Sequence, residues 1–246
     1  MRKTWAIIRR ELIAYFSSPL AYVVMTAFLL MQGYIFYLIV SFLNNPQTPA
    51  MTPLRLFFGG TIFFWLFLLF VVPVITMRLI AEERRSGTIE VLLTSPVNEA
   101  QVVGGKFMAA FVFYAALWLP TILYVVVLKR NSAIDLGPVI AGYIGVFLLG
   151  FLFLSVGTFA STLSNNQLIA AIIAFAAMVA LFSIGLVEQL LSTSFLKGAL
   201  AHMNLWTQMD DFAKGIVDSR HVIYQLSVGL LFLFLATKSL EVKKWR

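Results

Sequence analysis

Residues 81–96 read AEERRSGTIEVLLTSP and separate two long apolar runs of the chain. Four charged residues, Glu82, Glu83, Arg84 and Arg85, follow one another at the start of this stretch. Charged side chains are costly inside hydrocarbon, so a membrane interior cannot hold such a stretch. It lies either in water or against a soluble partner, between two segments that the membrane can hold.

The composition is that of a polytopic membrane protein. Of the 246 residues, 61% are hydrophobic and 12% are charged, whereas a soluble domain has roughly 45–50% apolar and about 25% charged residues. The absence of cysteine excludes disulfides, thiolate metal sites and cysteine nucleophiles. In a membrane protein, the net charge of +7 is better explained by an unequal distribution of Lys and Arg between inner and outer loops than by nucleic-acid binding.

Six runs have the length and polarity of membrane-spanning helices. A helix needs about 20 mostly apolar residues to cross the hydrocarbon, and helices satisfy their own backbone there. The sequence therefore predicts an all-α integral membrane fold with one transmembrane domain over residues 1–246. No cleavable signal peptide is expected, and Pro73 and Pro120 are expected to kink two of the helices. The predicted spans are 20–43, 57–80, 107–128, 139–163, 168–191 and 222–240.

The distribution of lysine and arginine predicts the orientation of these spans. With both termini inside, the inner segments carry twelve of the eighteen Lys and Arg residues and the outer segments carry six. Cytoplasmic loops are enriched in positive charge, so both termini and residues 81–106 are expected in the cytoplasm. The pair Lys129 and Arg130 goes against this pattern, or it anchors the outer end of the third span at the headgroups.

Residues 1–18 are expected to form an amphipathic helix on the inner leaflet. Trp5, Ile8, Leu12 and Tyr15 recur at steps of three and four and form one apolar stripe. Charged residues, among them Arg9 and Arg10, mark the other side of the helix. Trp5 is expected at headgroup depth. The alternative is that these residues form a basic amino-terminal segment that lies in solvent.

The cytoplasmic segment 81–106 contains signals for a short transverse helix. Gly87 ends the preceding run, and Thr88 can cap a helix whose apolar face is formed by Ile89, Leu92 and Leu93. Pro96 ends that helix, and Asn98, with Gln101 at the capping-box position, begins the next one. Such a helix can bind in a groove of another protein, or it can fold back and pack on its own bundle. The residues alone favour neither alternative.

Residues 192–221, between the last two spans, mix apolar and charged side chains. This pattern predicts one or two short helices at the outer interface or dipping into it. Backbone that re-enters the membrane is tolerated only where protein or water shields it.

Residues for catalysis or metal binding are not recognisable in the sequence. Gly104-Gly105-Lys106 resembles part of a phosphate-binding loop, but position 100 is Ala instead of Gly and Phe107 replaces the Ser or Thr that should follow the lysine. The chain is therefore not expected to hydrolyse ATP. The two histidines, His202 and His221, are expected to be polar interface residues and not metal ligands.

The polar stretch and three other segments resemble a known family. Glu82-Glu83-Arg84-Arg85-Ser86-Gly87-Thr88-Ile89-Glu90 through Leu93-Thr94-Ser95-Pro96 is similar to the coupling motif of type-2 ATP-binding-cassette (ABC) permeases. The similarity is greatest to the branch that includes the bacterial gliding-motility permease and the nitrous-oxide reductase maturation permease. Residues 9–19, 159–167 and 212–220 also match this pattern.

The resemblance implies a transport subunit of the bacterial inner membrane. Two permeases, either two copies or a copy and a paralogue, pair within membrane lipid, and two copies of an ABC ATPase bind beneath them. The ATPase binds ATP and Mg²⁺, and this chain carries no cofactor. The complex exports a lipid-linked glycan, lipid, drug or peptide, or it passes force to an extracytoplasmic partner protein. The alternative is a membrane scaffold or assembly factor that does not transport.

The resemblance also implies roles for named residues. The amino-terminal helix, with Trp5, Ile8, Arg9, Arg10 and Leu12, would help to link the ATPase to the first span. If the substrate passes between two copies, aromatic residues of the second span would line the path, or they face lipid instead: Phe63, Phe64, Trp65 and Phe67. The ATPase-coupling residues would be Glu82, Glu83, Arg84, Arg85, Ile89, Glu90, Leu92 and Leu93.

Overall fold

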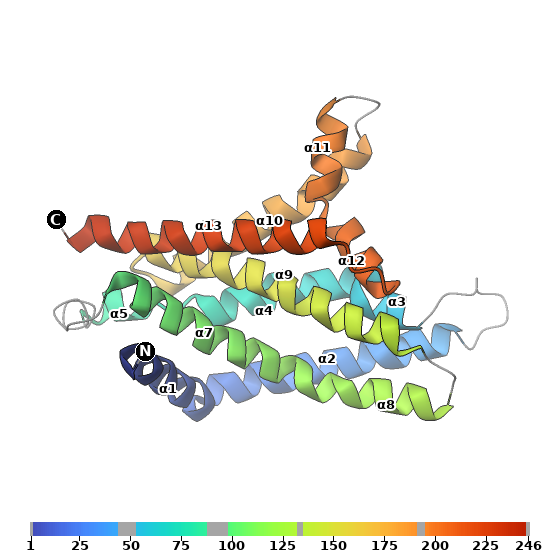
Figure 1. The fold of residues 1–246 in the computed structure, drawn as a ribbon. Coiled ribbons are helices and arrows are strands. Elements are labelled where there is room, and N and C mark those ends of the chain that lie inside the picture. Colours follow the sequence, from blue (N-terminus) through green and yellow to red (C-terminus); the bar gives the residue numbers. More distant parts are fainter. Residues whose placement is uncertain (1, 44–52, 88–97, 132–134, 191–194, 245–246) are drawn as a thin grey trace.

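The computed structural model is an all-helical bundle, and it describes residues 2–43, 53–87, 98–131, 135–190 and 195–244 (Figure 1). Two short elements are not α-helical: η1 is a π-helical turn and η2 is a 3-10 turn. The elements are α1 (Arg2–Ser17), α2 (Pro19–Leu43), α3 (Pro53–Arg55), η1 (Leu56–Gly60), α4 (Ile62–Thr76), α5 (Ala81–Arg85), α7 (Glu99–Trp118), η2 (Leu119–Thr121), α8 (Ile122–Asn131), α9 (Leu136–Leu163), α10 (Gln167–Leu190), α11 (Phe195–Met203), α12 (Leu205–Ala213) and α13 (Ser219–Lys244).

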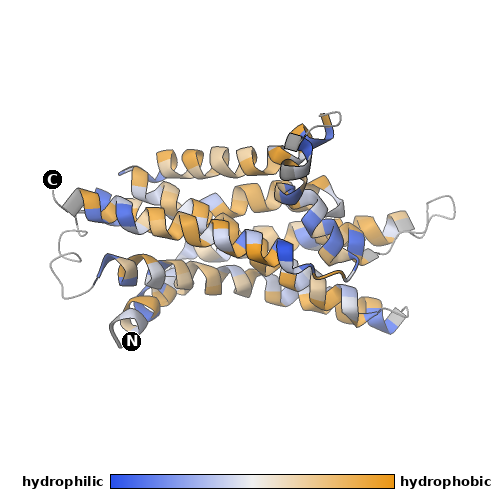
Figure 2. Ribbon diagram, turned by 45° about the horizontal axis from the view of Figure 1, so that its top comes forward, coloured by the Kyte–Doolittle hydropathy of each residue, from blue (hydrophilic) through white to orange (hydrophobic). Residues whose placement is uncertain are grey.

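The prediction of six membrane-spanning helices is confirmed. Six helical segments of the described chain are long and apolar enough to cross a membrane, and each overlaps one predicted span. Hydrophobic residues predominate along the middle of the bundle, and hydrophilic residues gather toward its ends (Figure 2). Pro120 lies in η2, where α7 changes into α8, whereas Pro73 lies within α4. The third span therefore changes to 3-10 geometry at its proline, and the kinks expected at the two prolines stay predictions.

The second span begins later than the sequence predicts. Residues 57–61 belong to the predicted run, but the helix breaks between Phe58 and Thr61 and α4 starts at Ile62. Gly59 has a φ of 100° there, a conformation that other residues rarely adopt. Trp65 holds the break in place by donating its indole N–H to the Gly59 carbonyl at 3.1 Å.

Helix α9 forms the centre of the bundle and packs against α4, α7, α10, α12 and α13. Two glycines permit this close packing. A Cβ atom on Gly150 would overlap the ring of Tyr114 on α7, and one on Gly157 would overlap Thr76 on α4. Helices that pack closely in membranes commonly have small residues at the contact.

The bundle has two distinct ends. Both termini, α1 and α5 lie at one end, here called the α1 end, and α3 and α12 lie at the other, the α12 end (Figure 1). The two predicted short helices before the last span are present as α11 and α12. Helix α12 is inserted into the bundle, since Leu205, Met209 and Phe212 are at most 1% exposed. Asn204 caps it by accepting hydrogen bonds from the backbone N–H groups of Trp206 and Thr207.

Candidate coupling site

Helix α1 packs lengthwise on α7 at the α1 end. The contact is close at Gly105, where an added Cβ would lie 2.9 Å from Cγ2 of Ile7. Tyr15 is buried and stacks on Phe113 of α7, with ring centroids 5.1 Å apart. The side chain of Leu12 packs against the same core. These contacts fix α1 to the transmembrane bundle.

The predicted apolar stripe of α1 is divided between two environments. Ile8 and Leu12 are half-buried, whereas Trp5 is 64% exposed, and its position at headgroup depth stays a prediction. The exposed side of α1 carries a second stripe formed by Trp5, Arg9, Ile13 and Phe16. The helix therefore uses one apolar stripe to bind the bundle and leaves a mixed apolar and basic stripe uncovered.

Four charged residues from three elements meet where α1, α5 and α7 converge, and we call Arg10, Glu11, Glu83 and Lys106 the charge cluster. Lys106 Nζ lies 3.0 Å from Oε1 of Glu11 and 3.0 Å from Oε1 of Glu83. Arg10 Nη2 lies 2.8 Å from the same Glu11 oxygen and 2.7 Å from the same Glu83 oxygen. Two cations and two carboxylates thus balance one another and join segments more than 70 residues apart.

The charge cluster is shielded from solvent to different degrees. The Lys106 side chain is 2% exposed and both carboxylates are 14% exposed, whereas Arg10 is 56% exposed. Burial alone would raise the pKa of the Glu11 carboxyl, but Lys106 and Arg10 outweigh burial and hold that pKa below its usual range. Glu11 therefore stays ionised at neutral pH. Removing one partner of such a buried group leaves an uncompensated charge.

A serine of α9 holds the turn between α4 and α5. Ser161 Oγ accepts hydrogen bonds from the backbone N–H groups of Ile80 and Ala81 at 3.0 and 3.1 Å. The same hydroxyl donates to the carbonyl of Met77 at 3.2 Å. Ser161 is fully buried. The start of α5 is therefore fixed to the central helix as well as to α1 and α7.

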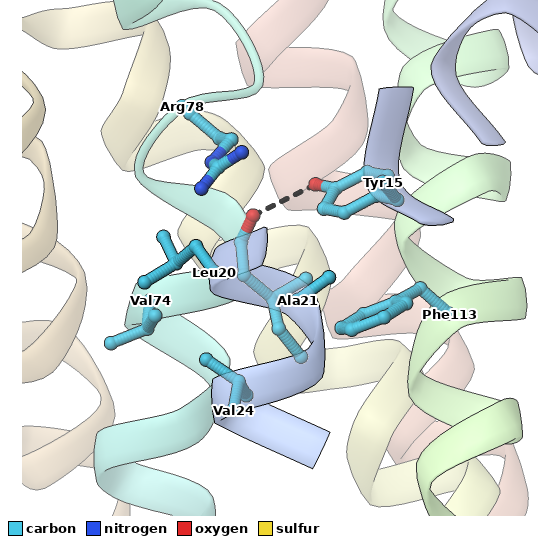
Figure 3. Close-up of a pocket in the computed structure, with 8 residues that line it drawn as sticks. Tyr15, Leu20, Ala21, Val24, Val74, Arg78 and Phe113 are labelled. Atoms are coloured by element: carbon cyan, nitrogen blue, oxygen red, sulfur yellow. Dashed lines mark hydrogen bonds between the residues drawn. The ribbon is translucent and has the colours of Figure 1, made fainter. Parts of the chain in front are cut away.

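The end of α1 is also bonded directly to α4 (Figure 3). The Tyr15 hydroxyl donates to the carbonyl oxygen of Ile75 at 2.8 Å. A small crevice beside this bond is lined by Tyr15, Arg78 and aliphatic residues that include Val24 and Val74. Burial raises the pKa of Tyr15, so this hydroxyl keeps its proton and remains a donor. Movement of α4 relative to α1 would break the bond.

The four charged residues predicted to couple are placed differently from one another. Glu82 and Arg85 are exposed on α5, and Glu83 belongs to the charge cluster. Arg84 is half-buried, and its two terminal nitrogens have no hydrogen-bond partner among the described residues. Gly87, with a φ of 69°, follows the last turn, as glycine commonly does at helix ends. Four further predicted coupling residues lie outside the described residues: Ile89, Glu90, Leu92 and Leu93.

Gly105 and Lys106, two residues of the Gly104-Gly105-Lys106 segment, have a packing role that the sequence did not predict. They lie inside helix α7, where Gly105 receives Ile7 and Lys106 binds two carboxylates. Asn98 precedes this helix, and its N–H donates to Gln101 Oε1 at 3.3 Å, at the predicted capping-box position.

The four aromatic residues proposed to line a path occupy different environments. Phe64 and Trp65 are 2% and 0% exposed, so they belong to the core of this chain and not to a surface between two copies. Trp65 stacks on Trp206 of α12, with centroids 5.7 Å apart. Phe67 is half-buried and Phe63 is 46% exposed. A surface role thus remains for Phe63 and, in part, for Phe67.

The histidines lie at the α12 end. His221 Nε2 lies 3.0 Å from Oδ2 of Asp211, which joins α13 to α12. In the part of the chain that the structure describes, no group of three or more His, Cys, Asp or Glu residues is arranged to hold a metal ion.

Two neighbouring glycines provide a matched test of the α1–α7 contact. Gly105→Ala should reduce the free energy of unfolding by about 1–3 kcal/mol because the new methyl group meets Ile7. Gly104→Ala should leave the protein as stable or up to about 1 kcal/mol more stable, since nothing lies within 4 Å and alanine favours helices. Thermal unfolding of the purified variants measures both effects.

The cost of Gly105→Ala should shrink in an Ile7→Ala background, because the clash is then relieved. Equal effects of the two glycine substitutions would contradict the packing of α1 on α7.

Comparison with known proteins identifies the family. The sequence model described as ABC-2 family transporter protein matches residues 47–200, which is more than half of the chain and includes the segment after α4. A search of curated proteins returned no match. The match, the six apolar helices and the architecture agree that this is a multi-pass membrane protein. The chain belongs to the ABC-2 transporter family and is a permease-type membrane domain.

Proposed function

We propose that this chain is the permease subunit of an ATP-driven complex and that a separate ABC ATPase binds ATP and Mg²⁺. Permeases of this family generally work with an ABC ATPase. The ATPase would contact the exposed face of α5, the segment that follows it, and the exposed stripe of α1. Movement of the ATPase would then displace the amino-terminal helix and the eight predicted coupling residues between Glu82 and Leu93.

The charge cluster is the observation that carries this proposal. Glu83 binds Lys106 of α7 and Arg10 of α1, and Ser161 of α9 holds the start of α5. A displacement of α5 would therefore reach the amino-terminal helix, the third span and the central span together. Such a linkage suits transmission of force from a cytoplasmic ATPase to the membrane helices.

A second permease would cover the surface formed by α4 and α10. A groove of about 270 Å³ lies between these helices. Its lining is apolar, and α10 exposes large side chains such as Ile172 and Leu186. An amphipathic substrate would pass between the two permeases. Phe63 and Phe67 would line its path, because they belong to α4, which forms one side of the groove. The groove is lined by Leu69, Phe70, Pro73, Val74, Ala171, Ile172 and Phe175.

Cysteine labelling tests the orientation that the proposal requires. In this cysteine-free chain, Ser86→Cys should not react with an impermeant maleimide added to intact bacteria, because α5 must face the ATP-containing side. Gly198→Cys on α11, at the opposite end, is the matched control and should react. Both positions are exposed.

After the cells are opened, the cysteine at position 86 should react as well. Labelling of Ser86→Cys in intact cells would contradict the proposed function, because no cytoplasmic ATPase would then reach α5.

A further inference from the structure

A second apolar groove opens between α2 and the start of α4, and its lining shares no residue with that of the groove between α4 and α10. It has a volume of about 280 Å³. Ile35 and Ile39 are buried and form its floor, whereas Leu38 and Phe63 are 38% and 46% exposed. The groove lies in the half of the bundle nearer the α12 end, because α2 ends there (Figure 1). Its lining is Ile35, Leu38, Ile39, Phe42, Leu56, Thr61 and Phe63.

The groove is built by the break before α4. Leu56 and Thr61, which stand on either side of the break, both line it. The break is fixed by the positive φ of Gly59 and by the hydrogen bond from Trp65 to the Gly59 carbonyl. Trp65 is itself fully buried. The backbone at one side of the groove is therefore held in place by a residue of the core.

One polar side chain in this lining lacks a partner. Thr61 stands at the N-cap position of α4, but its side chain makes no capping hydrogen bond. Its Oγ1 atom is buried and has no hydrogen-bond partner among the described residues. Threonine at this position usually caps the helix, and a buried hydroxyl without a partner is unfavourable. In this rotamer the Thr61 hydroxyl is closed to solvent, although the residue lines the groove. Rotation about χ1 to another staggered rotamer would turn the hydroxyl toward the groove, where it could donate a hydrogen bond to a ligand that carries an acceptor.

The surroundings restrict the chemistry of that ligand. Arg55, which directly precedes Leu56, already binds Asp210, with 2.6 Å between Nε and Oδ1 and 3.1 Å between Nη2 and Oδ2. The groove lining itself contains no charged residue. A phosphate or carboxylate would thus find no free cation in this segment, whereas a neutral carbonyl oxygen would suit the Thr61 hydroxyl.

We propose that this groove binds one acyl chain of a glycerophospholipid and that Thr61 donates a hydrogen bond to the ester carbonyl of that chain. The chain lies over Ile35 and Ile39, between Leu38 and Phe63. The lipid bilayer around the protein supplies such lipids. Their ester carbonyl oxygen is a hydrogen-bond acceptor at the headgroup end of an aliphatic chain. This site is separate from the α4–α10 groove and does not depend on coupling to an ATPase.

Photolabelling in lipid nanodiscs tests the proposal. The full chain is reconstituted with phosphatidylcholine that carries a diazirine on an ester-linked chain, or with the ether-linked analogue, which lacks the carbonyl. Mass spectrometry then compares labelling of Leu38 and Phe63 with labelling of Leu30, a 69% exposed residue elsewhere on α2. The ester lipid should label the groove about five-fold more than the ether lipid, the effect expected for one neutral hydrogen bond.

Two variants separate a specific site from ordinary lipid contact. Thr61→Val keeps the shape of the side chain and should reduce ester-lipid labelling to the ether-lipid level without changing the ether-lipid result. Leu38→Trp should reduce labelling of Phe63 by partly filling the groove, whereas Leu30→Trp should not; circular dichroism and thermal unfolding verify that each variant is folded. Equal labelling by the two lipids, labelling no stronger than at Leu30, or no effect of Thr61→Val would overturn the proposal.

Discussion

Lys106→Met should reduce the free energy of unfolding by about 3–5 kcal/mol. Methionine preserves much of the aliphatic stem of the 2% exposed lysine, but Glu11 and Glu83 would lose the cation that lies 3.0 Å from both of them. The two carboxylates contact the same two cations, so the loss of one cation increases the repulsion between them in a shielded position. Unfolding in detergent by titration with sodium dodecyl sulfate measures the loss.

Lys238→Met is the matched control for this substitution. Lys238 lies 2.7 Å from Glu241, and the two side chains are 52% and 37% exposed. Exposed pairs contribute at most about 1 kcal/mol, so this variant should unfold close to the wild type. Adding Glu11→Gln to Lys106→Met should recover part of the loss, because it removes one of the uncompensated charges. Similar losses in Lys106→Met and Lys238→Met would show that the charge cluster does not stabilise the fold.

Leu92→Asp should release the ATPase or uncouple it. The sequence places Leu92 on the apolar face of the predicted coupling helix, and a carboxylate introduced into an apolar contact must lose its water, which costs about 2 kcal/mol or more. A loss of about 2 kcal/mol weakens binding roughly 30-fold. Co-purification of the ATPase with a tagged chain, followed by measurement of ATP hydrolysis, reports the effect. Because Leu92 is expected to face a partner, thermal unfolding of the isolated chain should stay unchanged.

Glu90→Ala is the comparison for Leu92→Asp. Charges at the rim of an interface usually contribute little, so this variant should retain the ATPase. If Leu92→Asp also retains the ATPase and full hydrolysis, the predicted helix does not couple the two proteins.

The membrane spans were predictable because each is a long apolar run. Hydrophobicity alone, however, does not reveal a break inside such a run. The start of the second span was placed at Phe57 because residues 57–58 and 62–70 are all apolar. The structure ends that run at Gly59, whose positive φ allows the chain to turn before α4. The pair Gly59-Gly60 was the available signal, since glycine favours such turns.

The amino-terminal helix illustrates a second limit. Its periodicity predicted an apolar stripe, but a stripe does not specify whether it meets lipid or protein. The structure turns Ile8 and Leu12 toward the bundle and leaves Trp5 exposed. Close approach at Gly105 makes this contact possible, and Gly105 is distant from α1 in the sequence. The partner of the stripe therefore depended on tertiary packing.

The charge cluster was predicted only in part. Glu83 and Arg10 were proposed as functional residues, but each was assigned to a different segment. Glu11 and Lys106 were not, because their pairing joins positions 95 residues apart. A lysine next to the apolar run that starts at Phe107 was the available signal, since a charge at such a position needs a partner. Ser161 gave no comparable signal, because a serine in an apolar helix commonly bonds its own backbone.

The composition of the complex tests the central claim most directly. We propose to purify the tagged chain from the membrane of its native cell, measure the mass of the intact complex by native mass spectrometry, and label its subunits with a photoreactive ATP analogue. The account predicts two permease subunits of the size of this 27.5 kDa chain, together with two copies of a separate subunit that takes the ATP label and hydrolyses ATP. A chain that is isolated alone, or with partners that neither bind nor hydrolyse ATP, would contradict the account and favour a membrane scaffold.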